Sequence, residues 1–164
     1  MFMSKAKTPV TAAIRLLRQH KVGFSDHLYE YEERGGTAHS AHALGLPEHA
    51  VVKTLIMEDD RHEPLIVLMH GDLQVSTKEL ARQIGARSIA PCAPEVANRH
   101  SGYLVGGTSP FGTRHAMPVY VEATILELPR IWINGGKRGY LIGIEPSVLS
   151  TVLKPLPVRV GIPG

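Results

Sequence analysis

The chain has 164 residues, 43% of them apolar and 20% charged, which is the composition of one folded domain rather than of a disordered chain. Its net charge of +3 is too small for the concentrated basic stripe of a duplex-binding protein, so we expect no DNA partner. No apolar run reaches the roughly 20 residues that span a bilayer, so we expect no membrane partner. Residues 1–7 are too short and too polar for a secretory signal, which predicts a cytoplasmic protein.

The first half of the chain begins with a predicted helix, capped by Thr8 and with Pro9 in its first turn. Gly23 is expected to end this helix. The segment 24–31 predicts a strand, and Thr37 predicts the cap of a short helix that ends at Gly45. The apolar face of the first helix is formed by Val10, Ala13, Ile14 and Leu17.

A central hairpin is predicted from two apolar runs, 51–57 and 64–69, with a polar turn between them. Lys53 interrupts the first run. A lysine there must reach the surface or meet a partner, and an edge or end position in the sheet would explain it without any function. Ser76 then predicts the cap of a helix that Gly85 ends.

The second half alternates short strands and helical turns. The dipeptide Asn134-Gly135 predicts a hairpin turn, which Gly136 to Gly139 widen, and the proline-rich tail 155–164 is expected to be loosely held. Together the elements predict a single mixed α+β domain, 1–164, with a curved mixed or antiparallel sheet flanked by short helices. The remaining predicted strands are 87–90, 119–122, 130–134 and 140–144, and the remaining predicted helical segments are 94–98, 125–128 and one that begins at Pro146.

A glycine-rich loop at 102–112 is the most distinctive stretch of the chain. The run 103–105 predicts the end of a buried strand, and Gly106-Gly107 then allow positive φ and close approach to a ligand. Their amides can point at an anion, while Pro110 stiffens the exit of the loop. An ordinary strand-to-loop turn remains the alternative, since the spacing matches no nucleotide-binding fingerprint.

Two other residue types invite a chemical role. His39 and His42 are three residues apart and His49 follows, but no complete metal-ligand motif is present, so solvated surface histidines are the favoured interpretation. A metal-dependent hydrolase built on these histidines is kept as a weaker hypothesis. Cys92, the only cysteine, lies between prolines without a basic neighbour in sequence, which favours a bystander thiol over a nucleophile.

In order and spacing, five segments resemble the YbaK family of aminoacyl-tRNA deacylases, which are free-standing relatives of the editing domain of bacterial prolyl-tRNA synthetases. The resemblance covers nearly the whole chain, from about Thr8 to Leu153. The glycine loop and the Gly-Gly-Lys-Arg-Gly run are specific only when taken together. The segments are Thr8 to Leu17, His27-Leu28-Tyr29, Val52-Lys53-Thr54-Leu55, Ser101 to Gly112, and Gly135 to Gly139.

This resemblance implies a compact domain with a curved sheet that removes wrongly attached amino acids from tRNA in trans. It implies cysteine on proline tRNA as the typical substrate, with some action on cysteine tRNA, and no cofactor or metal. The implied partners are the acceptor end of aminoacyl-tRNA and prolyl-tRNA synthetase. Where relatives carry Phe-Gly-Asp-Glu-like residues, this chain has Gly35 to Ser40, so the preferred amino acid stays open.

The resemblance also implies site residues, each taken from the position of this chain that matches the family motif. Lys53 matches the family lysine and is the predicted catalytic residue. The predicted substrate-binding residues are Tyr29, Thr54, Gly106, Gly107, Thr108, Ser109, Pro110, Gly136 and Lys137.

The residues make this function chemically reasonable because an aminoacyl ester is already reactive, so positioning and oxyanion stabilisation are sufficient for cleavage. For cysteine, the resemblance implies that the substrate thiol attacks its own ester and leaves as a thiolactone; water attack is the alternative for other amino acids. A non-catalytic module that binds aminoacyl-tRNA or a synthetase is the competing hypothesis, since no protein nucleophile is evident.

Overall fold

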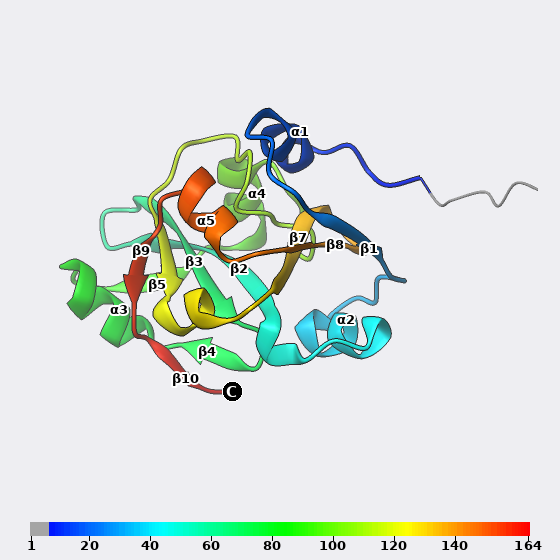
Figure 1. Cartoon of the computed structure of the whole chain (residues 1–164). Coiled ribbons are helices and arrows are strands. Elements are labelled where there is room, and N and C mark those ends of the chain that lie inside the picture. The colour runs from blue at the N-terminus through cyan, green and yellow to red at the C-terminus, as the bar shows by residue number, and fades with distance from the viewer. Residues whose placement is uncertain (1–6) are drawn as a thin grey trace, which may run out of the picture.

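The computed structural model describes residues 7–164 and arranges them around one mixed, eight-stranded sheet (Figure 1). The strand order is β1-β8-β7-β2-β3-β6-β9, with β5 paired to β2 beside this path. The predicted mixed α+β class is therefore confirmed. The strands of this sheet are β1 (Ser25–Leu28), β2 (Val51–Asp59), β3 (Pro64–His70), β5 (Ile89–Pro91), β6 (Val119–Glu122), β7 (Ile131–Lys137), β8 (Tyr140–Ile144) and β9 (Leu156–Val158).

The predicted hairpin is confirmed as β2 and β3, which pair antiparallel from Val52–His70 to Glu58–Pro64. Its turn is fixed by Asp59, whose Oδ1 accepts hydrogen bonds from the amides of Arg61 and Glu63. The outer edges of this hairpin pair in parallel, β2 with β7 and β3 with β6. The sheet is therefore mixed because later strands add in parallel to an antiparallel centre.

Among residues 7–164, five helices pack around the sheet, and the first begins later than the sequence predicts. Thr11, rather than Thr8, caps α1, because its hydroxyl accepts a hydrogen bond from the Ile14 amide at 3.2 Å. Val10 is consequently exposed, whereas the other predicted apolar-face residues are buried. The helices are α1 (Ala12–Gln19), α2 (Gly36–Leu44), α3 (Thr77–Ile84), α4 (Pro94–Ser101) and α5 (Ser147–Val152), with short 3-10 turns η1 (Glu48–Ala50) and η2 (Ala123–Glu127).

The two faces of the sheet bury different helices. Val52 and Ile56 point into the large core beneath α1, α4 and α5. Because side chains alternate along a strand, their neighbours Val51 and Met57 point to the other face, where they pack with α2 and α3 respectively. Lys53 shares the face of Val51 and Met57, which we call the α2 face.

The prediction of a loosely held tail is wrong. Residues 156–158 form β9 beside β6, and β10 (Gly161–Pro163) pairs with β4 (Leu73–Val75) in a separate two-stranded sheet (Figure 1, red and green). The Glu122 carboxylate accepts the amides of Val160 at 2.8 Å and Gly161 at 3.0 Å. Prolines did not prevent this docking, because both strands lie at sheet edges, where a missing amide donor is tolerated.

Two expectations drawn from the sequence concerned a secretory signal and membrane-spanning segments. The prediction that residues 1–7 are not a secretory signal stays a prediction, because residues 1–6 lie outside the described residues. Within residues 7–164, no helix has the length and apolar character needed to cross a bilayer.

Candidate functional site

Lys53 lies in β2, an interior strand of the sheet, directly after the residues of β2 that pair with β7. On one edge, β2 pairs with β7 only at Val51 and Val52 and with β5 only from Met57 onward, so that no strand pairs with the edge between them. The Lys53 Nζ donates a hydrogen bond to the Leu73 carbonyl at 2.7 Å. Lys53 is thus not in an edge strand of the sheet. It lies beside the unpaired stretch of β2 between the residues that pair with β7 and those that pair with β5.

Tyr29 lies on the same α2 face. Tyr29 directly follows β1, and its amide donates a hydrogen bond to the Gly139 carbonyl at 3.0 Å. The strand β1 is shorter than the strand predicted over 24–31. The ring packs against the cluster of Val51 and Leu141 and meets the His39 ring edge-on at 5.8 Å. Burial raises the pKa of the Tyr29 hydroxyl, so it is a neutral phenol at physiological pH.

Thr54 does not join this group, because it follows Lys53 in the strand and points to the opposite face. Its hydroxyl is buried, and no residue in the range 7–164 forms a hydrogen bond with it. Thr37 likewise differs from expectation. It does not cap α2, whose first residue follows Gly35, and its hydroxyl instead donates to the Glu48 carboxylate and the Gly71 carbonyl.

The glycine loop follows a helix, not a strand. Gly102 ends α4 in the left-handed conformation, and the predicted strand 103–105 is wrong. Tyr103 is buried and its hydroxyl donates to the Phe111 carbonyl at 2.6 Å, while Leu104 and Val105 are exposed. The tyrosine therefore closes the base of the loop and leaves its tip on the surface.

The amides of the loop divide into used and free donors. Gly107 donates to the Leu104 carbonyl at 2.8 Å, and Phe111 donates to the Ser109 hydroxyl at 3.2 Å. Within the described part of the chain, the amides of Thr108 and Ser109 have no acceptor. Ser109 is completely buried, whereas Thr108 is partly exposed, so the Thr108 amide is the donor that a ligand can reach, in a loop whose exit is fixed by Pro110.

Asn134 and Arg138 hold the tip of this loop. The Asn134 Nδ2 donates to the Gly106 carbonyl at 3.0 Å, and the Arg138 Nε donates to the Val105 carbonyl at 2.9 Å. The Arg138 guanidinium also lies over the Tyr31 ring, 5.0 Å from its centroid. We call the loop 104–110 together with these two side chains the loop clamp.

The loop clamp depends on a β-bulge in β7, between Asn134 and Lys137, where the sequence predicts a turn. The strand β7 continues past Asn134 to Lys137 with a bulge, and the Asn134 Oδ1 accepts the amides of Gly136 at 2.7 Å and Lys137 at 3.1 Å. The hairpin turn itself is at Arg138 and Gly139. Asn134 thus faces the glycine loop instead of turning the chain.

Strand register brings the clamp to the face of Lys53. Val52 pairs with Ile133 in parallel and both point into the large core. The next residue on each strand, Lys53 and Asn134, therefore points to the α2 face. The structure thus brings Lys53, Tyr29 and the Gly106 end of the loop to one face, while Thr54 lies on the other.

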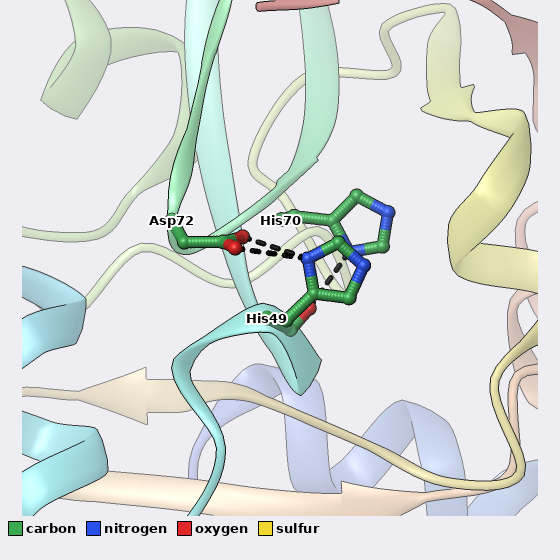
Figure 2. Close-up of side chains that lie close together, drawn as sticks. All are labelled: His49, His70 and Asp72. Carbon is green, nitrogen blue, oxygen red and sulfur yellow. Dashed lines mark hydrogen bonds and ion pairs between the residues drawn. The ribbon is translucent and has the colours of Figure 1, made fainter. Parts of the chain in front are cut away.

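A second group of polar side chains surrounds the turn between β3 and β4 (Figure 2). The His49 Nδ1 lies 2.8 Å from the Asp72 Oδ1, and the His49 ring stacks on the His70 ring with centroids 3.8 Å apart. The weaker hypothesis of a metal site built on His39, His42 and His49 is not supported, because the structure does not bring these three side chains together as a ligand group. His39 contacts the Glu30 carbonyl instead, and among residues 7–164 the only group placed to hold a metal is His49, His70 and Asp72.

Sequence reasoning missed Asn134, Arg138, His70 and Asp72. For the first two a signal was present, because they flank the glycines of the Gly-Gly-Lys-Arg-Gly run. Nothing in the sequence pointed to His70. Cys92 is half-buried, and burial, followed by the nearby Glu58 carboxylate, raises the pKa of its thiol, as expected of a bystander.

Sequence comparison finds similar proteins over most of the chain. The protein named "Putative Cys-tRNA(Pro)/Cys-tRNA(Cys) deacylase EbsC" of Enterococcus faecalis is 28% identical over 149 residues, covering 90% of this chain and 91% of the relative. A proline–tRNA ligase of Streptococcus equi subsp. zooepidemicus is 30% identical over 105 residues, which are 63% of this chain but 17% of the ligase.

Among solved structures, one described as a putative trans-editing enzyme for prolyl tRNA synthetase superposes with a TM-score of 0.80 at 19% identity, covering 94% of this chain and 99% of that one. This likeness shows a shared fold. The profile of the aminoacyl-tRNA editing domain matches residues 32–151, a span that includes Lys53, the glycine loop and Asn134. This chain therefore belongs to the aminoacyl-tRNA editing domain family.

Proposed function

We propose that this protein is an aminoacyl-tRNA deacylase that acts in trans, with cysteine on proline tRNA as its main substrate and cysteine on cysteine tRNA as a second one. The observation that carries the proposal is the shared face of Lys53, Tyr29 and the loop clamp. The name of the Enterococcus faecalis relative, which is matched over nearly its whole length, supports the same substrates.

Each group has a role that its chemistry allows. The Lys53 ammonium binds a phosphate or the substrate backbone, and the partly buried Tyr29 ring packs on the terminal adenine. The free amide of the partly exposed Thr108 donates to the ester carbonyl oxygen and stabilises the negative charge that develops there. Lys137, exposed beside Gly136 in the bulge, adds a second positive charge for the tRNA backbone.

For a cysteinyl ester the substrate supplies the nucleophile. Its thiol sulfur attacks the ester carbonyl carbon, the bond to the ribose oxygen breaks, and that oxygen receives the thiol proton. The products are a cyclic thiolactone and free tRNA. The protein contributes orientation and oxyanion stabilisation, so Cys92, with its raised pKa, has no part in the step.

The test is a panel of cysteinyl-, alanyl- and prolyl-tRNA, followed by loss of the ester with the parent protein and with Lys53→Met. This substitution keeps the aliphatic stem and removes the charge. We expect turnover of cysteinyl-tRNA in the parent and a loss of about 100-fold or more in the variant, the size expected when a transition-state contact is removed. Lys78→Met, at an exposed lysine on α3, is the matched control and should behave as the parent.

The competing function is a binding module that recognises an aminoacyl end or a synthetase without cleaving anything. It is favoured if tRNA binding is lost in Lys53→Met while the parent never releases an amino acid at enzyme concentrations equal to substrate. Relatedness to proline–tRNA ligases makes prolyl-tRNA synthetase the partner we propose, and its co-purification with the tagged protein tests that separately.

A further inference from the structure

The Asp72–His49 pair has the arrangement of an oriented base. The His49 Nδ1 lies 2.8 Å and 3.1 Å from the two Asp72 oxygens. A carboxylate only accepts hydrogen bonds, so Nδ1 carries the proton and Nε2 of the neutral ring keeps its lone pair. Figure 2 shows Nε2 on the side of the ring away from Asp72. The His49 side chain is 48% exposed, so the ring is in contact with solvent.

The ring of His70 stacks against the ring of His49. It is completely buried, with its Nδ1 2.7 Å from the His49 carbonyl oxygen and its Nε2 2.6 Å from the Thr124 hydroxyl. The carbonyl only accepts, so Nδ1 is the protonated nitrogen and Nε2 of the neutral ring accepts from Thr124. Both ring nitrogens are occupied, which disfavours His70 as a metal ligand. Its ring instead forms a flat floor, 8° from parallel, on which His49 stacks.

The turn that carries Asp72 is rigidly placed. The Gly71 carbonyl accepts from the Thr37 hydroxyl at 3.0 Å. A side chain at Gly71 would lie 2.6 Å from the Glu48 carbonyl oxygen, so the turn packs directly on the η1 segment that carries His49. The pair is therefore preorganised by the hydrogen bond from the Thr37 side chain of α2 and by packing of the turn on η1.

The same turn connects the pair to the candidate site. Leu73, the residue after Asp72, offers the carbonyl to which the Lys53 Nζ donates at 2.7 Å. Val52, the residue before Lys53, is the strand partner of His70. Because strand partners share a face, His70 points with Val52 to the large-core face, while Lys53 points to the α2 face. The ammonium and the histidine pair thus lie on either side of one short turn, 70–73.

We propose that His49, oriented by Asp72 and by stacking on His70, is the general base that activates water for aminoacyl esters without a thiol. This inference rests on the proposed deacylase function. The His49 Nε2 takes a proton from water as the water oxygen bonds to the ester carbonyl carbon. The tetrahedral intermediate then breaks its bond to the ribose oxygen, which receives that proton from the imidazolium. Free amino acid and tRNA are the products.

The test compares cysteinyl-tRNA with S-methylcysteinyl-tRNA, whose sulfur cannot act as an intramolecular nucleophile. In His49→Gln, the ratio of cysteinyl to S-methylcysteinyl turnover should rise about 100-fold, the usual contribution of a general base. Asp72→Asn should raise the ratio less, because the ring stays but loses its orienting charge. Added imidazole should restore S-methylcysteinyl turnover in His49→Ala. The control is His62→Gln, since His62 is another exposed histidine beside a carboxylate, Glu58, and there the ratio should stay at the parent value.

The outcomes separate this inference from the function on which it rests. If the parent cleaves cysteinyl-tRNA but not S-methylcysteinyl-tRNA, the deacylase stands and the base is refuted. An unchanged ratio in His49→Gln with normal thermal unfolding also refutes it. Loss of S-methylcysteinyl turnover on chelation would assign the water activation to a metal ion instead. No turnover of any ester in the parent overturns the deacylase function itself.

Discussion

Two regions beside the strand of Lys53, the loop clamp and the turn 70–73, are built in opposite ways. The clamp offers the main-chain amide of Thr108, in a loop held in place by Asn134 and Arg138. The turn offers side chains, His49 and Asp72, held in place by main-chain packing around Gly71. One region exposes backbone and is supported by side chains, whereas the other exposes side chains and is supported by backbone.

This difference determines what each region tolerates. A backbone cradle requires glycine where φ is positive, and Gly106 has φ of +90°. A side-chain base requires one particular side chain and allows ordinary backbone around it. Substitutions at glycine should therefore damage the clamp, and isosteric polar substitutions should damage the turn, so the two regions can be tested independently.

The largest effect is expected from Gly106→Val. A side chain there would place its Cβ 2.6 Å from the Tyr31 Oη, and valine disfavours the positive φ. We expect turnover of cysteinyl-tRNA to fall about 100-fold, as when reacting groups are misplaced by about 1 Å. Steady-state kinetics and thermal unfolding are the measurements.

Gly45→Val separates backbone strain from damage to the clamp. Gly45 also has positive φ, +65°, but nothing lies within 4 Å of the position of a Cβ. The strain of positive φ should lower the free energy of unfolding of Gly45→Val by about 1–3 kcal/mol, as it does in Gly106→Val, but turnover of cysteinyl-tRNA should stay at the parent value. If both variants lose turnover equally, strain rather than the clamp explains the first result.

A smaller effect is expected from Asn134→Asp. The substitution keeps the oxygen that accepts the Gly136 and Lys137 amides and removes the donor to the Gly106 carbonyl. Loss of one net hydrogen bond, about 1 kcal/mol, predicts roughly a 5-fold lower kcat/KM with cysteinyl-tRNA. Asn98→Asp, which removes a donor to the Tyr103 carbonyl at the base of the loop, is the comparison that shows whether the tip is special.

Arg138→Met should have a weaker effect again. The guanidinium is exposed, so its hydrogen bond to the Val105 carbonyl and its contact with the Tyr31 ring compete with water. We expect about a 3-fold loss in kcat/KM, equivalent to about 0.7 kcal/mol. A loss comparable to that of Gly106→Val would mean that Arg138 binds tRNA directly rather than holding the loop.

Local signals predicted the parts of the fold that local chemistry determines. The β2–β3 hairpin follows from two apolar runs, and α3 follows from its Ser76 cap and Gly85 end, all as the structure has them. The tail could not be predicted in this way. Its docking depends on the Glu122 carboxylate, which is far away in sequence, and on edges of strands whose positions only the complete sheet defines.

The candidate site shows the same division. Lys53 and the glycine loop were identified because their sequence pattern resembles a family, and the structure places both on one face. Asn134 was predicted to turn the chain because Asn-Gly favours hairpins, but the bulge moves the turn to Arg138 and Gly139. His70 reads as one more residue of a buried strand, and only its contacts with His49 and Thr124 distinguish it.

The smallest effect is expected at Cys92, which belongs to neither region. If the clamp supplies the oxyanion donor and the substrate or water supplies the nucleophile, Cys92→Ser should keep parent turnover with every ester. Burial and Glu58 raise the pKa of the thiol, so less thiolate is present at pH 8 than for a free cysteine. Alkylation by iodoacetamide at pH 8 should be correspondingly slow and should increase as the pH rises further. Fast alkylation at pH 8, together with loss of turnover in the serine variant, would identify a protein nucleophile that neither region provides, and both accounts of the chemistry would then be wrong.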